Sequence, residues 1–173
     1  KPSVLEFILD EERVEHADDE MKTTAVILLI MGQSMYWGHV GDSRLYFFRN
    51  HKLVTRTLDH SVPQMLVNAG ELKEKKIRKH PDRNKLLRVM GTEWDEPRYV
   101  VSGIQDLMPG DAFLLCSDGF WELIEEKTMI SLLKKSSSVE EWMDEMVAEV
   151  KKNGIDTNMD NNSAIAELLS ILV

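Results

Sequence analysis

The sequence has only one cysteine, Cys116, among its 173 residues. A lone thiol cannot form an internal disulfide, so a small secreted scaffold held by disulfides is excluded. No segment near the first residue combines a basic flank, an apolar core and a small-residue cleavage site, which is the pattern of a secretory signal. We therefore expect a cytoplasmic protein.

Long apolar runs are also missing. The longest uninterrupted one extends from Ala25 to Met31, whereas a membrane-spanning helix needs roughly 20 apolar residues. Positive charge is scarce, since 21 lysines and arginines face 30 aspartates and glutamates and leave a net charge of −9. Because nucleic acid is usually bound by a clustered basic surface, we expect neither a membrane span nor a nucleic-acid partner.

One basic cluster stands out against this acidic background. Its members are Lys73, Lys75, Lys76, Arg78 and Lys79. Such a run is most often the solvated face of a helix, and the second interpretation is a surface that attracts an anionic substrate. The sequence slightly favours the first interpretation and leaves the second open.

The length and an apolar fraction of 43% fit a single domain over residues 1–173. Ser3 and Glu6 have capping-box spacing and predict a helix over residues 3–16, followed by an acidic linker to residue 20. From residue 23 onward, β-branched and aromatic runs separated by turn residues predict an antiparallel meander. These runs cover residues 23–31, 35–40, 44–49 and 52–57.

The second half alternates helical and extended patterns. Ser61 predicts a helix start and Gly70 its end, and strands are expected over 97–103, 111–117 and 164–173. Ser138 opens a second capping box, after which apolar residues recur at helical spacing and are expected in the core. They are Val139, Trp142, Met143, Met146, Val147 and Val150.

Three aspartates follow apolar strands, where their carboxylates can point into a shared cleft: Asp42, Asp118 and Asp160. Taken singly, each fits an ordinary turn residue, because Asp accepts hydrogen bonds from nearby backbone amides. The segment 156–167 has the acidic spacing of an EF-hand calcium loop. Asn161 stands where that loop needs glycine, so we expect no calcium-sensing module.

In their order and spacing, several short stretches make the chain similar to the metal-dependent protein phosphatases of type 2C (PPM), in their bacterial form. The resemblance covers nearly the whole chain from Met21 onward. The stretches are Thr23-Thr24-Ala25, Val40-Gly41-Asp42-Ser43-Arg44, Asp59-His60-Ser61, His80-Pro81 with Arg83-Asn84 and Arg88, Leu107 through Gly110-Asp111, Leu114-Leu115-Cys116-Ser117-Asp118-Gly119, and Asp160-Asn161.

This resemblance implies an α+β fold, a four-layer αββα sandwich of two antiparallel sheets flanked by helices. It also implies two, and in the complete domain up to three, Mg²⁺ or Mn²⁺ ions. Asp118 and Asp160 would bind the dinuclear centre, whereas Asp42 and Glu122 would correspond to ligands of a third, weaker site; Glu122 stands where the family often has Asp. The residues expected in the turns beside these ligands are Gly119, Asn161 and Ser43, and a variable flap is expected over 68–87.

The function implied is hydrolysis of phosphoserine and phosphothreonine monoesters in proteins by metal-activated water. Hard divalent ions prefer carboxylate oxygen, and no nucleophilic side chain is then needed. Cys116 is accordingly interpreted as a buried strand residue, since no glycine-rich loop with an arginine follows it. His60 and His80 are interpreted as structural.

The resemblance also has gaps. The family begins with a phosphate-binding arginine, a Glu-Asp pair and an Asp-Gly motif, none of which is found here, and Lys22 replaces the usual glycine. The expected metal site is therefore half a site. We expect a truncated phosphatase that is inactive alone and self-associates through an incomplete sheet. The alternative is a non-catalytic regulatory or binding module on the same fold.

Overall fold

The computed structural model describes residues 22–92, 95–96, 98–155 and 160–169. The predicted helix over 3–16 and the acidic linker to residue 20 lie outside the described residues, as do residues 156–159 of the calcium-loop pattern. The chain divides into two compact units, one of residues 1–43 and 58–106, the other of residues 44–57 and 107–173. No described helix is long and apolar enough to cross a membrane.

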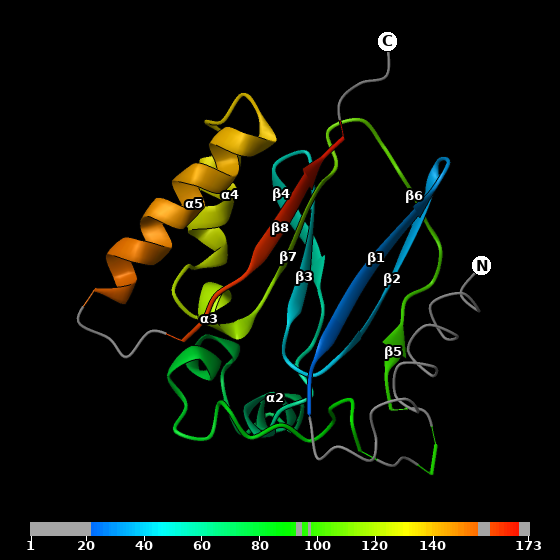
Figure 1. Ribbon diagram of the computed structural model, residues 1–173, viewed down its shortest axis with the longest axis vertical. Coiled ribbons are helices and arrows are strands. Elements are labelled where there is room, and N and C mark those ends of the chain that lie inside the picture. Colours follow the sequence, from blue (N-terminus) through cyan, green and yellow to red (C-terminus); the bar gives the residue numbers. More distant parts are fainter. Residues whose placement is uncertain (1–21, 93–94, 97, 156–159, 170–173) are drawn as a thin grey trace. The chain divides into compact units, whose positions relative to one another are not determined.

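The first unit is built on a β-hairpin. Strands β1 (Ala25–Met31) and β2 (Ser34–Val40) pair antiparallel, with Ala25 opposite Val40 and Met31 opposite Ser34. Two short strands, β5 (Val100–Val101) and β6 (Gln105–Asp106), also pair with β2. Helix α2 (Val62–Asn68) and the 3₁₀ helix η1 (Glu74–Lys79) complete the described elements of this unit (Figure 1).

The second unit contains a four-stranded antiparallel sheet in the order β4-β3-β7-β8. Its strands are β3 (Arg44–Arg49), β4 (Lys52–Arg56), β7 (Ala112–Cys116) and β8 (Ala164–Leu168). Its helices are α3 (Asp118–Trp121), α4 (Glu126–Leu133) and α5 (Val139–Gly154). Figure 1 shows α4 and α5 along one side of this sheet.

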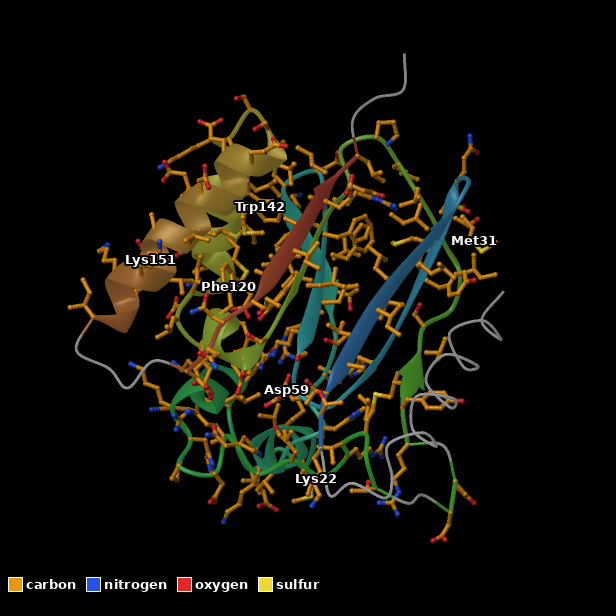
Figure 2. The ribbon with its side chains drawn as sticks, viewed as in Figure 1. Lys22, Met31, Asp59, Phe120, Trp142 and Lys151 are labelled. Carbon is orange, nitrogen blue, oxygen red and sulfur yellow. The ribbon has the colours of Figure 1, made fainter. Side chains whose placement is uncertain are left out.

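Trp142 joins α5 to both neighbours. Its ring meets the ring of Phe48 on β3 edge to face at 5.6 Å, and its Nε1–H donates to the carbonyl oxygen of Met129 on α4 at 3.0 Å. The side chain is fully buried and points from α5 toward the sheet (Figure 2). Of the six apolar residues expected in the core, Trp142, Met146 and Val150 are buried, whereas the other three are half-buried.

Both capping predictions within the described residues are confirmed. The Ser61 hydroxyl accepts from the backbone N–H of Gln64 at the start of α2, and the Ser138 hydroxyl accepts from that of Glu141 at the start of α5. Gly70 follows α2 with a positive φ of 76°. Polar side chains therefore satisfy orphan amides at these helix starts, as their spacing indicated.

The predicted meander is wrong at its centre. The first four strands fall close to their expected ranges, but β2 and β3 do not pair, and they belong to different sheets. β3 pairs with β7, about 70 residues later in the chain, from Arg44 opposite Cys116 to Phe48 opposite Ala112. Local patterns indicate that a segment is a strand but do not identify a distant partner.

Of the strand expected over 97–103, the described residues form only a two-residue strand, Val100 and Val101.

Candidate metal site

Asp118 is placed by the end of β7. The chain leaves this buried strand through Ser117, and Asp118 is the first residue of α3 rather than part of an open turn. Its carboxylate Oδ1 accepts from the backbone N–H of Gly119 at 2.9 Å. Glu122 follows four residues later, with its backbone N–H donating to the Asp118 carbonyl at 2.9 Å. This spacing puts both carboxylates on one helical face.

Asp160 belongs to the exposed segment that leads into β8. Its Oδ1 accepts from the backbone N–H of Asn161 at 2.8 Å, the same local hydrogen bond that Asp118 makes with Gly119. In both residues the second oxygen, Oδ2, accepts no hydrogen bond from the described part of the chain. Each carboxylate is thus oriented by its own backbone and retains one oxygen for another ligand.

The two aspartate segments are fastened to each other. The backbone N–H of Ser117 donates to the carbonyl of Ser163 at 3.0 Å, and the N–H of Ser163 donates to the hydroxyl of Ser117 at 3.1 Å. Gly119 packs directly on the opposite backbone, because a Cβ there would lie 2.5 Å from the carbonyl oxygen of Asn161 and 3.2 Å from that of Asp160. Only glycine allows this approach. We call residues 117–119 with 160–163 the aspartate clasp.

The clasp offers the oxygen ligands that Mg²⁺ and Mn²⁺ prefer. It does not form a complete site by itself, since within the described residues no three His, Cys, Asp or Glu side chains gather closely enough to hold an ion. Two aspartates on backbone segments that are in contact fit half of a dinuclear site, and further ligands are needed for the rest.

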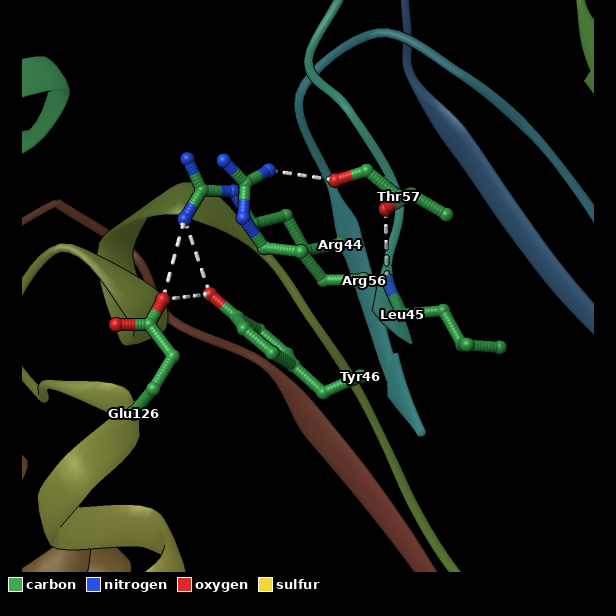
Figure 3. A network of polar contacts seen from close by, with 6 residues as sticks. All are labelled: Arg44, Leu45, Tyr46, Arg56, Thr57 and Glu126. Carbon is green, nitrogen blue, oxygen red and sulfur yellow. Dashed lines mark hydrogen bonds and ion pairs between the residues drawn. The ribbon is translucent and has the colours of Figure 1, made fainter. Parts of the chain in front are cut away.

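Arg44 supports α3 from the side of β3. Its guanidinium lies 3.4 Å from the centre of the Trp121 ring and donates to the Tyr46 hydroxyl at 3.0 Å. Its Nη1 is also 3.9 Å from Oε1 of Glu126, to which Tyr46 donates at 3.4 Å (Figure 3). Arg44 is 1% exposed. A desolvated cation stacked on an indole is one of the stronger side-chain contacts, so Arg44 holds the helix that contains Asp118.

Asp42 belongs to the first unit and is 7% exposed. Gly41 before it has a φ of 95°, and a Cβ there would collide with the side chain of Thr24. Ser43 after it shares a hydrogen bond of 2.8 Å with the Thr24 hydroxyl. The Asp42 turn is therefore held on both sides by one threonine and requires glycine at its first position.

A pair of stacked histidines lies beside this turn. The rings of His39 and His60 are 4.7 Å apart and nearly parallel. His60 binds both sides of Gly41: its ring Nδ1 accepts from the Gly41 N–H at 3.1 Å, and its backbone N–H donates to the Gly41 carbonyl at 2.9 Å. His39 donates through Nε2 to the carbonyl of Leu58 at 2.9 Å, and among the described residues its buried Nδ1 has no hydrogen-bond partner.

Burial favours the neutral form of both rings. It lowers the pKa of His39 below its ordinary value, against the opposing influence of the Leu58 carbonyl. Burial, followed by the neighbouring His39 and Arg88, lowers the pKa of His60 from 6.5 to about 4, although Asp59 acts in the opposite direction. A neutral His60 can accept the Gly41 N–H, whereas a protonated one cannot. The structural interpretation of His60 agrees with these contacts.

Two other sequence interpretations can be compared with the structure. Cys116 is buried at the end of β7, as expected of a strand residue. His80 accepts from the backbone N–H of Asp82 at 3.1 Å and so contributes to a turn. Local sequence patterns indicate no role for Arg44, Ser117 or Ser163. Arg44 was visible in the Gly-Asp-Ser-Arg stretch, but a contact with Trp121 has no local signal.

The comparison with protein-family models matches residues 3–65 to "Protein phosphatase 2C". This match begins at residue 3, whereas the resemblance recognised from the motifs begins at Met21. Among curated proteins, the chain is similar to "Serine/threonine phosphatase stp" of Listeria monocytogenes, with 32% identity over 156 residues. That alignment covers 87% of this chain and 61% of the relative, so the chain spans less than two thirds of the relative's length.

Solved structures give the same result. The Mycobacterium tuberculosis serine/threonine phosphatase PstP/Ppp matches with a TM-score of 0.75 and 27% identity, over 94% of this chain and 67% of that one. A structure of the catalytic domain of PstP in complex with two manganese ions has a TM-score of 0.70 and 24% identity, over 95% of this chain and 66% of that one. The second match bears on the fold alone.

The chain belongs to the protein phosphatase 2C family. Within that family, the relatives reported above are bacterial serine/threonine phosphatases. The predicted family and the predicted α+β fold with two antiparallel sheets are confirmed. The ligand roles of Asp42, Asp118, Glu122 and Asp160 and the single-domain boundary stay predictions.

Proposed function

We propose that the protein is a metal-dependent serine/threonine phosphatase that hydrolyses phosphoserine and phosphothreonine monoesters of proteins. The observation that supports the proposal is the close approach of Gly119 to the backbone of Asp160 and Asn161, which brings the backbone segments of Asp118 and Asp160 together. The similarity to bacterial serine/threonine phosphatases supports the same conclusion.

In this proposal Asp118 and Asp160 bind two Mg²⁺ or Mn²⁺ ions. When bound, such ions activate water and neutralise phosphoryl oxygens. The chain's own contribution is orientation. The Gly119 and Asn161 amides fix Asp118 and Asp160, and Arg44 holds the helix that starts at Asp118. Preorganised ligands need no rearrangement when substrate arrives.

The substrate class follows from the type of chemistry rather than from a pocket. Hydrolysis by activated water needs no covalent intermediate on a side chain, which agrees with the buried position of Cys116.

We further propose that the protein acts in the cytoplasm, as its single cysteine indicates. Cell fractionation with an antibody against the chain would test this location.

The test compares Asp118→Asn and Asp160→Asn in the full-length protein, with Mn²⁺-dependent hydrolysis of a phosphothreonine peptide as the readout. Both substitutions remove a charged ligand with little change in shape, so we expect kcat/KM to fall by at least about 100-fold. The matched control is Asp144→Asn, an exposed residue of α5, which should keep full activity. Circular dichroism and the melting temperature show whether each variant remains folded.

The outcome also separates the proposal from its alternative. A non-catalytic regulatory module would show no Mn²⁺-dependent hydrolysis even in the full-length wild type. Activity retained in a folded Asp118→Asn or Asp160→Asn variant would overturn the ligand assignment but not the phosphatase activity. Loss of activity confined to these two variants would support both the ligand assignment and the phosphatase activity.

A further inference from the structure

Positive charge is concentrated in residues 73–88. This segment has eight lysines and arginines and two acidic residues, a net charge of +6. Because the whole chain has −9, all other residues together have −15. So strong a separation within one chain creates a local positive potential that attracts anions to this segment while the remaining surface repels them.

The 3₁₀ helix η1 lines up three of these charges. Lys73 precedes the helix and its carbonyl accepts the backbone N–H of Lys76 at 2.8 Å, and Lys79 is the last helical residue. In a 3₁₀ helix, residues three apart are eclipsed and rise about 2.0 Å per residue, so Lys76 and Lys79 follow one another at roughly 6 Å. Lys73, the N-cap residue, has an extended backbone and lies one turn before Lys76, to which its carbonyl is hydrogen-bonded. All three are exposed. We call Lys73, Lys76 and Lys79 the lysine row.

The row is fixed to a folded base. Ile77, in the same helix, is 2% exposed and anchors η1. The chain then returns to the segment after β4, where the Lys85 carbonyl accepts from Val62 at 3.0 Å and the Leu87 N–H donates to the carbonyl of His60 at 2.7 Å. His60 in turn binds both sides of Gly41, next to Asp42. Hydrogen bonds thus connect residues 85–87, which follow the row in the chain, with the Asp42 turn.

We infer that the lysine row binds an extended, acidic segment of the phosphoprotein substrate, with acidic side chains at alternate positions. An extended chain rises about 3.3 Å per residue, so every second side chain lies on the same face at roughly 6.6 Å, close to the spacing of the row. This inference rests on the proposed phosphatase function and adds a substrate class to it.

A short acidic peptide suits the row better than a larger polyanion does. A nucleic acid or an anionic membrane extends beyond three lysines and meets the acidic surface formed by the rest of the chain. A peptide segment of about five residues spans roughly the same 12 Å as the row.

The experiment measures KM of the full-length protein for three phosphothreonine peptides of equal length. One has three glutamates at alternate positions, the second has the same glutamates consecutively, and the third has glutamines. The test variant changes Lys73, Lys76 and Lys79 to Gln. The matched control changes Lys134, Lys135 and Lys151 to Gln, which are exposed lysines of the second unit and alter the net charge equally.

We expect the alternating-glutamate peptide to have a KM about tenfold lower than the glutamine peptide, since each exposed ion pair contributes a few-fold. The peptide with consecutive glutamates should show a smaller decrease in KM relative to the glutamine peptide. The row variant should lose the preference without a change in kcat on the glutamine peptide, and the control should keep it. The preference should disappear near about 0.5 M salt, where exposed charges are screened.

Either of two kinetic results would overturn the inference: equal KM values for the glutamate and glutamine peptides in the wild type, or equal losses of the preference in the two triple variants. Fluorescence anisotropy with a phosphate-free glutamate peptide separates this inference from the proposed function, because it requires no catalysis. Row-dependent binding of this peptide, together with no hydrolysis of the phosphothreonine peptides, would refute the phosphatase proposal but support the lysine row as a peptide-binding site. Tighter row-dependent binding of an oligonucleotide or an anionic vesicle would refute the row as a peptide site.

Discussion

Gly119→Ala is the sharpest perturbation of the aspartate clasp. The new Cβ would lie 2.5 Å from the carbonyl oxygen of Asn161, 3.1 Å from its carbon and 3.2 Å from the oxygen of Asp160. All three are backbone atoms, so no side chain can swing away. A relaxed contact needs roughly 3.5 Å, so the two segments must separate by about 1 Å.

The energetic consequence can be worked from the contacts. Overpacking costs about 1–3 kcal/mol, and a 1 Å displacement also weakens the hydrogen bonds between Ser117 and Ser163, each worth about 1 kcal/mol. Alanine is the better helix former at this position in α3 by up to about 1 kcal/mol, which offsets part of the loss. We expect a net destabilisation of about 2 kcal/mol and a melting temperature lower by about 4–8 °C.

Function should suffer more than stability, because a ligand misplaced by about 1 Å can reduce catalysis 100-fold. The assay is thermal unfolding of the full-length protein with and without Mn²⁺, followed by phosphothreonine peptide hydrolysis. The control is Gly103→Ala, where a Cβ would meet no atom within 4 Å and no change is expected. If Gly119→Ala matches the wild type in melting, in the Mn²⁺ response and in rate, the clasp does not hold the ligands.

Three further predictions concern the supports of the two units. Arg44→Met should destabilise the protein by about 2–3 kcal/mol in urea unfolding, because it removes the stacked cation on Trp121; Arg44→Lys should recover only part, and full recovery would refute the stacking argument. For His60, the folded pKa of about 4 lies below the ordinary 6.5, so the unfolded chain binds the extra proton between these values. Stability is then complete above about pH 6.5 and falls by up to about 2 kcal/mol at pH 5, while His60→Asn should flatten this slope. Trp142→Phe should cost about 1–2 kcal/mol, since it leaves the Met129 carbonyl without its buried donor; an unchanged urea midpoint would contradict this.

Much of the local structure could be predicted from the sequence. The strands β1 to β4 were indicated by apolar and β-branched runs, and the starts of α2 and α5 by Ser61 and Ser138 with their partners three residues later. These features depend on contacts within a few residues, which the sequence displays directly. The family could be recognised for a related reason, because its short motifs are themselves local.

The pairing of distant segments could not be predicted in this way. β3 pairs with β7 and not with β2, and the clasp joins Ser117 to Ser163, 46 residues apart. Neither contact leaves a periodic trace, since a strand looks the same whichever partner it has. Gly119 is the exception in hindsight, because a glycine immediately after a candidate ligand signals a close backbone approach.

The stretch from Gly41 to Arg44 illustrates why a motif can be recognised before it is understood. Its first residues belong to one unit and Arg44 begins the other. Gly41 is needed because its positive φ and its contact with Thr24 leave no room for a side chain. Arg44 is needed for a different reason, since it stacks on Trp121 and so supports the helix that begins at Asp118. One short motif therefore orients two aspartates. Gly41 shapes the turn that contains Asp42, and Arg44 supports the helix that contains Asp118, although neither Gly41 nor Arg44 is itself a candidate ligand.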